Sequence, residues 1–187
     1  MRLTLRFRLL AALFPLLSAG AASVVDRVAV VVDQDVITES EVRDDLRLTE
    51  FLDNRPLDLG PAARRQAAEH LVDQQLIRRE LELSKYPQPQ ASEADALLRG
   101  FLQSRFHSDA EYRAALQTFG ISEDQLKQRL LWQLTAIRFT DSRFGSPQST
   151  GSPPAGNTGT DVDQQMDAWL KQARSSSKIT FKQEAFQ

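Results

Sequence analysis

Sixteen consecutive residues without a charged side chain, GSPQSTGSPPAGNTGT at 145–160, separate the last 27 residues from the rest of the chain. The stretch holds four of the eight glycines and three of the eight prolines. Both residue types interrupt helices and strands, so the stretch predicts a flexible linker. The residues that follow are fewer than the roughly 40 that a domain needs to fold unaided. We therefore expect the tail, residues 161–187, to fold back onto the segment before the linker.

The N-terminal 22 residues have the three parts of a secretory signal peptide. Three arginines precede an apolar run at 9–17, and small residues follow at 19–21. The run is about half of the roughly 20 residues that span a bilayer, so we expect cleavage rather than a membrane anchor. Residues 1–22 are therefore a predicted signal peptide, and the mature protein is expected outside the cytoplasm without stable membrane insertion.

Composition argues against several classes of function. Of 23 lysine and arginine residues, three lie in the predicted signal peptide, which leaves 20 against 25 acidic residues. A chain with this balance and no basic stripe is not expected to bind nucleic acid. The absence of cysteine excludes disulfides, a thiol nucleophile and cysteine-ligated metal.

The remaining polar residues form no recognisable catalytic motif. The two histidines, His70 and His107, have no second histidine or cysteine at a useful spacing, so we expect structural roles for them. The segment 33–35 lacks the glycine and glutamate of a calcium loop, and no phosphate-binding glycine loop occurs. We therefore expect no catalytic residue, no metal and no cofactor.

Valine-rich segments near the N-terminus predict a β-hairpin, with one strand at 28–32 and a polar turn at 33–35 before the second. Near the C-terminus, the sequence KITFK predicts one further strand, with Ile179 and Phe181 on the same side. A single strand is unstable alone, and an unpaired strand edge is a liability. The tail is therefore expected to add its strand to the hairpin and its helix to the helical core.

Capping patterns predict a series of helices between the hairpin and the linker. Ser and Thr residues stand three positions before Glu, Asp or Gln at several places, and Gly120 suits the end of one helix. In the last of these helices an apolar stripe is expected to face the core, with Trp132 and Phe139 off that stripe. The predicted helices begin near Glu39, Pro61, Ser92, Ser108 and Ser122, and another begins at Asp161 or Asp163.

These segments follow one another in the order of a known family. The hairpin VVDRVAVVVDQDVITESEV, the long helix AAEHLVDQQLIRRELELSKYP, and the segment ASEADALLRGFLQSRFHSDAEYRAALQTFGISEDQLKQRLLWQLTAIRF resemble the N-terminal domain of the SurA family of periplasmic chaperones. The tail AWLKQARSSSKITF is similar to the segment that returns to complete that domain. The resemblance implies a mainly α, multi-helix domain at 23–144, whose small sheet is completed by the C-terminal strand.

Members of this family commonly carry parvulin prolyl-isomerase domains between the helical part and the tail, whereas only residues 145–160 stand there in this chain. The resemblance therefore implies a periplasmic, ATP-independent chaperone for unfolded outer-membrane proteins and not an enzyme. Two alternatives stay open, an assembly module that docks one folded partner and, less favoured, a prolyl isomerase. An oligomer in which the tail docks on a neighbour is also open.

A chaperone of this kind needs an apolar groove for unfolded, aromatic-rich segments. An aromatic side chain at helical spacing is more often part of a core, so the binding role is assigned to the aromatic set and not to any single member. The candidate groove residues are Phe101, Phe106, Phe119, Trp132, Phe139 and Trp169.

Overall fold

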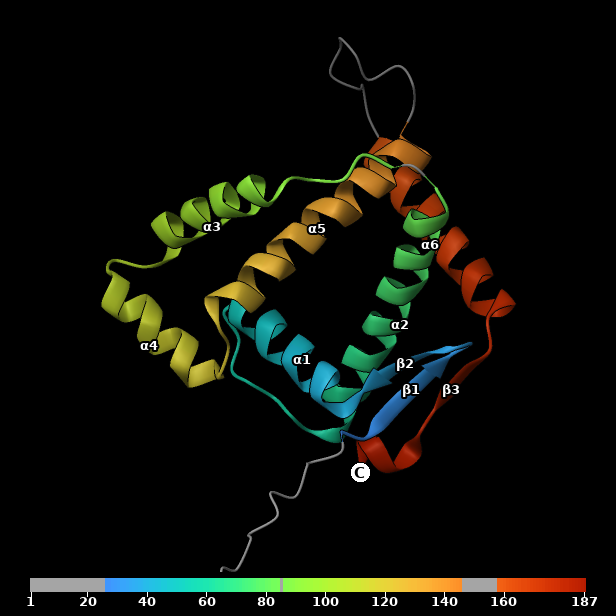
Figure 1. Cartoon of the computed structure of the whole chain (residues 1–187), viewed down its shortest axis with the longest axis horizontal. Helices are drawn as coiled ribbons and strands as arrows, with labels where there is room; N and C mark the ends of the chain where they lie inside the picture. Colours follow the sequence, from blue (N-terminus) through green and yellow to red (C-terminus); the bar gives the residue numbers. More distant parts are fainter. Residues whose placement is uncertain (1–25, 85, 146–157) are drawn as a thin grey trace, which may run out of the picture.

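The structure is a computed structural model that describes residues 26–84, 86–145 and 158–187. Helices make up most of it, and a three-stranded antiparallel sheet lies at one edge of the molecule (Figure 1). The mainly α fold with a small sheet that the sequence predicts is thus confirmed. The predicted signal peptide and residues 146–157 of the predicted linker lie outside the described residues.

The sheet joins the two ends of the described chain. β1 (Val28–Val32) and β2 (Asp35–Thr38) form the predicted hairpin, and β3 (Ile179–Phe181) pairs with the other edge of β1. Both pairs are antiparallel, and the strand order is β2-β1-β3. The C-terminal strand therefore completes the sheet, which satisfies the backbone groups that β1 would otherwise leave unpaired.

The rest of the tail also packs against α2 (Pro61–Leu83). In α6 (Thr158–Ser176), Nε of Arg174 lies 2.6 Å from Oδ1 of Asp73, and its Nη1 lies 2.7 Å from Oε2 of Glu69. The short 3₁₀ helix η1 (Gln183–Phe186) then buries Phe186 in the core. The tail thus combines ion pairs with apolar burial. Its helix begins three residues before Asp161, the earlier of the two predicted starts, and one glycine in a helix costs only about 1 kcal/mol.

Three helices begin at the N-cap residues that the sequence predicts, Thr38, Ser108 and Ser122. Thr38 Oγ1 accepts the N–H of Glu41, while the N–H of Thr38 donates to the Glu41 carboxylate over 2.7 Å. Ser122 forms the same reciprocal box with Gln125. Gly120 ends the preceding helix in the left-handed conformation, with φ of 64°. The helices other than α2 and α6 are α1 (Glu39–Asp53), α3 (Ala91–Arg105), α4 (Asp109–Phe119) and α5 (Glu123–Phe144).

The start of α3 corrects one prediction. Its cap is Gln90 and not Ser92, and the N–H of Gln90 donates to Oε1 of Glu93 over 2.7 Å. Glu93 can serve this cap and also bind Arg138 of α5, a contact that fixes α3 against α5. The earlier start therefore uses a local box between Gln90 and Glu93, and Glu93 is also fixed by its contact with α5.

Two separate groups of buried side chains stabilise the fold. The first lies between the sheet, α1, α2 and η1, and the second between α1, α3, α4 and α5. Helix α1 contributes to both, because Val42 and Leu46 belong to the first group and Leu48 and Phe51 to the second. Helix α1 thus connects the two groups, and α3 and α4 extend away from the sheet (Figure 1).

Candidate functional site

The six aromatic residues expected to line one groove lie in three different places. Phe101, Phe106 and Phe119 surround Phe51, at ring-centroid distances of 5.8, 6.1 and 5.6 Å. All three are half-buried and belong to the packing between α1, α3 and α4. Their main contacts are therefore those of a core, and the prediction of a common groove with the other three is wrong.

Phe139 is a core residue as well, which corrects its assignment to the groove. Its side chain is 0% exposed. Tyr86, Phe144 and Trp169 cover its ring, with centroids at 5.2, 6.2 and 5.3 Å. Two of these rings come from outside α5, one just after α2 and one from the tail, so the spacing within α5 could not predict that Phe139 would be enclosed.

Trp169 differs from Phe139 because it borders an open groove between α2 and α6. The groove has a volume of about 320 Å³. Its apolar walls are Leu76 and Leu83 from α2, and Trp169 and Ala173 from α6. Leu83 is 78% exposed, although the periodicity of α2 predicts it to share a stripe with buried residues. Leu76 is only 5% exposed, so Leu83 and the half-buried Trp169 provide most of the apolar surface that a bound chain could contact.

Charged pairs lie along the rim of this groove. Nη1 of Arg143 lies 2.6 Å from Oε1 of Glu80 and 3.0 Å from the Tyr86 hydroxyl, and its guanidinium is 5.4 Å from the Trp169 ring centroid. At the other end, Arg79 binds Asp33 and Asp35. Hydrogen bonds to these two carboxylates raise the pKa of Arg79, so the rim keeps its charges. Gln172, Ser176 and Ser177 add neutral donors and acceptors.

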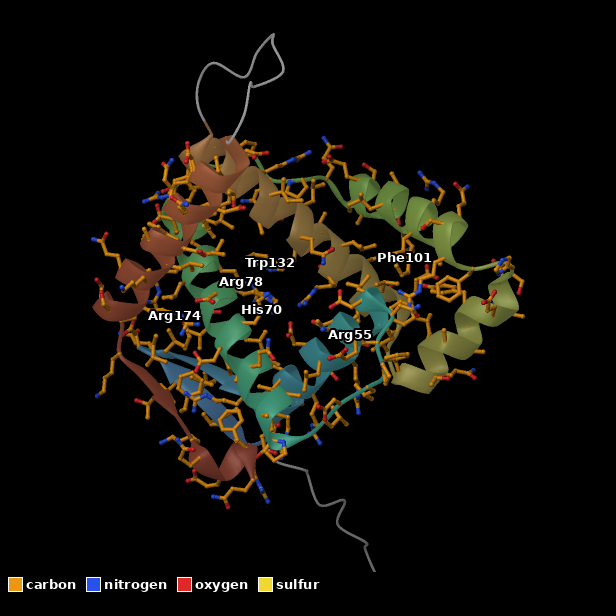
Figure 2. All side chains as sticks on the ribbon, turned by 180° about the vertical axis from the view of Figure 1, so that it is seen from behind. Arg55, His70, Arg78, Phe101, Trp132 and Arg174 are labelled. Atoms are coloured by element: carbon orange, nitrogen blue, oxygen red, sulfur yellow. The ribbon has the colours of Figure 1, made fainter. Side chains whose placement is uncertain are left out.

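Trp132 lies on the opposite side of α2 from the groove. The guanidinium carbon of Arg78 is 4.8 Å from its ring centroid, and Figure 2 shows the two side chains together between α5 and α2, far from Phe101. The groove residues Leu76, Arg79, Glu80 and Leu83 share the other face of α2. Trp132 and Trp169 therefore cannot contact the same short segment of a partner.

A buried polar network joins α1, α2 and α5 below Trp132. Arg129 binds Asp45, and its Nη2 lies 2.7 Å from Oγ1 of Thr49. Asp45 also contacts His70 Nδ1 at 3.4 Å and Gln74 Nε2 at 3.3 Å. Burial alone would raise the pKa of Asp45, but the hydrogen bond from His70 and the charge of Arg129 outweigh it and lower the pKa. The expected structural role of His70 agrees with this geometry.

Metal ligands and membrane-spanning helices are two further features that bear on function. No three histidine, aspartate or glutamate side chains gather to hold a metal ion in the part of the chain that the structure describes. Among the same residues, no helix is both long and apolar enough to cross a membrane. The chain matches no protein-family model, and a search of curated proteins gives no significant match. The site is therefore interpreted from its own geometry.

Sequence reasoning missed most of the groove. It named Trp169 but none of the residues opposite it. Leu76 and Leu83 lie on the same face of α2, so their positions in the sequence do not show that Leu76 is buried and Leu83 exposed. The usable signal was the end of α2. Its last turn holds Leu83 between Glu82 and Ser84, and polar neighbours at a helix end favour exposure.

Proposed function

We propose that the protein is a periplasmic, ATP-independent chaperone that binds unfolded outer-membrane proteins in the groove between α2 and α6. The observation that carries this proposal is an open groove with apolar walls, in which Leu83 is exposed and Trp169 is half-buried. Apolar side chains that border a groove are typical of binding sites. The N-terminal pattern of a signal peptide and the resemblance to the SurA family support the location and the class of client.

Binding in this groove needs no energy source. A client that buries apolar side chains against Leu83 and Trp169 gains about 25 cal/mol for each Å² removed from water. It loses conformational freedom on binding, so we expect reversible, micromolar affinity. The charged rim around Arg143 and Glu80 can bind water or the client's main chain, and release follows when the client reaches a better burial site.

An assembly module that docks one folded partner is the second candidate, and the size of the groove favours it. A volume of about 320 Å³ lies at the lower end of the roughly 300–1,000 Å³ of ligand sites, which suits a few side chains of one partner. Client breadth separates the two functions, because a chaperone binds many unfolded chains weakly and a module binds one folded protein. Prolyl isomerase activity is not part of the proposal.

The test uses purified residues 23–187 and a fluorescently labelled outer-membrane barrel protein that is diluted from denaturant. We expect saturable binding by fluorescence anisotropy to the unfolded barrel and none to a folded soluble control. Binding to neither would favour the assembly module. A prolyl-isomerisation assay on a model peptide should stay at the uncatalysed rate of tens of seconds, and acceleration would overturn the assignment as a non-enzyme.

Replacing Leu83 by Ser is expected to weaken client binding several-fold with little loss of stability. The side chain is 78% exposed, so its removal leaves no cavity, and surface substitutions usually change stability by no more than about 0.5 kcal/mol. Leu97→Ser is the matched control, since Leu97 is an exposed leucine on α3 away from the groove. Equal binding by the two variants would place the client elsewhere.

A further inference from the structure

The face of α2 that points away from the groove carries an arginine with an unusual environment. In the described residues, most arginines bind a carboxylate, including Arg79, Arg129, Arg143 and Arg174. Arg78 does not, because no described carboxylate lies within 4.0 Å of it, including Glu82 one turn further along α2. Its side chain is exposed, and it donates no hydrogen bond to a described residue.

Trp132 holds this guanidinium in place. The distance of 4.8 Å from the guanidinium carbon to the ring centroid is within the range of a cation–π contact. Such a contact leaves the N–H groups of the guanidinium free to donate. A carboxylate can accept two parallel hydrogen bonds from these donors, and a guanidinium already held by a ring loses less freedom when it binds.

The surroundings favour one kind of occupant. Trp132 is half-buried, so its ring provides an apolar surface beside the Arg78 guanidinium. His70 lies on the same face of α2, eight positions before Arg78 (Figure 2). The carboxylate nearest to His70 is Asp45, which is buried and bound to Arg129. Glu82 is the exposed carboxylate one turn beyond Arg78, but it does not lie within 4.0 Å of the guanidinium, so the N–H groups of Arg78 stay available to a carboxylate of a partner.

We propose that the Arg78–Trp132 surface binds a segment of a partner protein that carries aspartate or glutamate, with one carboxylate held by Arg78. This site is independent of the proposed groove, because the two lie on opposite faces of α2. It can act whether or not the protein is a chaperone. Together the two faces would allow one client to contact α2 on both sides, or two partners to bind at once.

The chain offers a direct reporter, since Trp132 and Trp169 are its only two tryptophans. A Trp169→Phe variant leaves Trp132 as the single tryptophan next to Arg78. We would titrate this variant with an unstructured peptide of alternating Glu and Ser, and with the same peptide in which Gln replaces Glu. We expect a saturable change in tryptophan fluorescence with the Glu peptide, which weakens as salt rises, and no change with the Gln peptide.

Matched substitutions decide whether the contact is specific. Arg78→Gln should weaken binding of the Glu peptide about tenfold or more, as expected for loss of a charge-assisted pair. Arg99→Gln should leave it unchanged, because Arg99 is an exposed arginine on α3 with neither a carboxylate nor an aromatic ring as partner among the described residues. Circular dichroism of each variant checks that the fold is retained.

Three results would overturn the proposal. They are equal binding of the Glu and Gln peptides, a loss with Arg99→Gln as large as that with Arg78→Gln, and no fluorescence change with either peptide.

A fourth variant, Arg78→Lys, keeps the charge but loses the planar fork, so its affinity for the Glu peptide should lie between those of the parent and Arg78→Gln. None of these results depends on binding of unfolded outer-membrane proteins, so this proposal and the proposed function fail separately.

Discussion

A chain that ends at residue 157 is expected to lose cooperative unfolding. The removed part contains β3, α6 and η1, and so exposes one edge of β1 and the surface that Phe186 covers. Loss of a buried Phe side chain alone costs about 3–5 kcal/mol, against a total stability of about 5–15 kcal/mol for a whole domain. Thermal unfolding followed by circular dichroism, with hydrogen exchange at β1, measures the effect.

The tail itself provides the control for this deletion. A synthetic peptide of residues 158–187, added to the shortened chain, should restore protection of the β1 amides, because the tail is joined to the core by pairing and packing as well as by the linker. Phe186→Ala in the full chain should give an intermediate loss of about 3–5 kcal/mol. An unchanged thermal midpoint in the shortened chain, with protection kept at Val28–Val32, would show that the tail does not stabilise the core.

Replacing Arg129 by Leu is expected to cost about 3–5 kcal/mol at pH 7, because it leaves Asp45 charged and buried without its cation. The side chains of Arg129 and Asp45 are only 9% and 4% exposed. Asp45→Asn in the same chain should recover part of the loss, since it removes the unpaired charge. Urea denaturation of the parent, both single variants and the double variant measures the coupling.

The destabilisation caused by Arg129→Leu is expected to depend on pH. In the parent the pKa of Asp45 lies below its ordinary value of 3.8, so its contribution to stability is fully present above 3.8 and is lost as the pH falls from there through the lowered pKa of the folded state. In Arg129→Leu the carboxylate is buried with less compensation, so protonation relieves the cost and the destabilisation should shrink between pH 7 and pH 4. A destabilisation that stays constant over this range would contradict the account.

Helix α5 explains why the groove residues could not be predicted from spacing. Its apolar positions Leu126, Leu130, Leu134 and Ile137 share one face, yet Leu126 is buried and Ile137 is 57% exposed. The first half of α5 packs against α1 and α3, whereas its C-terminal end meets the tail. A single stripe assumes a single packing partner. Because the partner changes along α5, the buried face changes too, and Phe139 is as fully buried as Leu126 although it lies off the stripe.

The sequence by itself determined the local elements. The boxes at Thr38 and Ser122, the end of α4 at Gly120 and the need of β1 for a second partner rest on interactions within a few residues or on one strong pattern. The packing of the tail against the rest of the chain also followed from the sequence, because the 27 residues after the linker cannot bury enough apolar surface alone.

Only the tertiary structure decided which side chains stay exposed. Trp169 borders a groove because α6 lies beside α2, and Trp132 meets Arg78 because α5 approaches α2 from the side opposite the groove. Burial depends on which elements approach a residue from far along the chain. Arg78 and Trp132 are 54 positions apart, and Leu76 and Trp169 are 93 positions apart. Spacing within one helix fixes the direction of a side chain relative to its neighbours, whereas packing between helices fixes what that side chain meets.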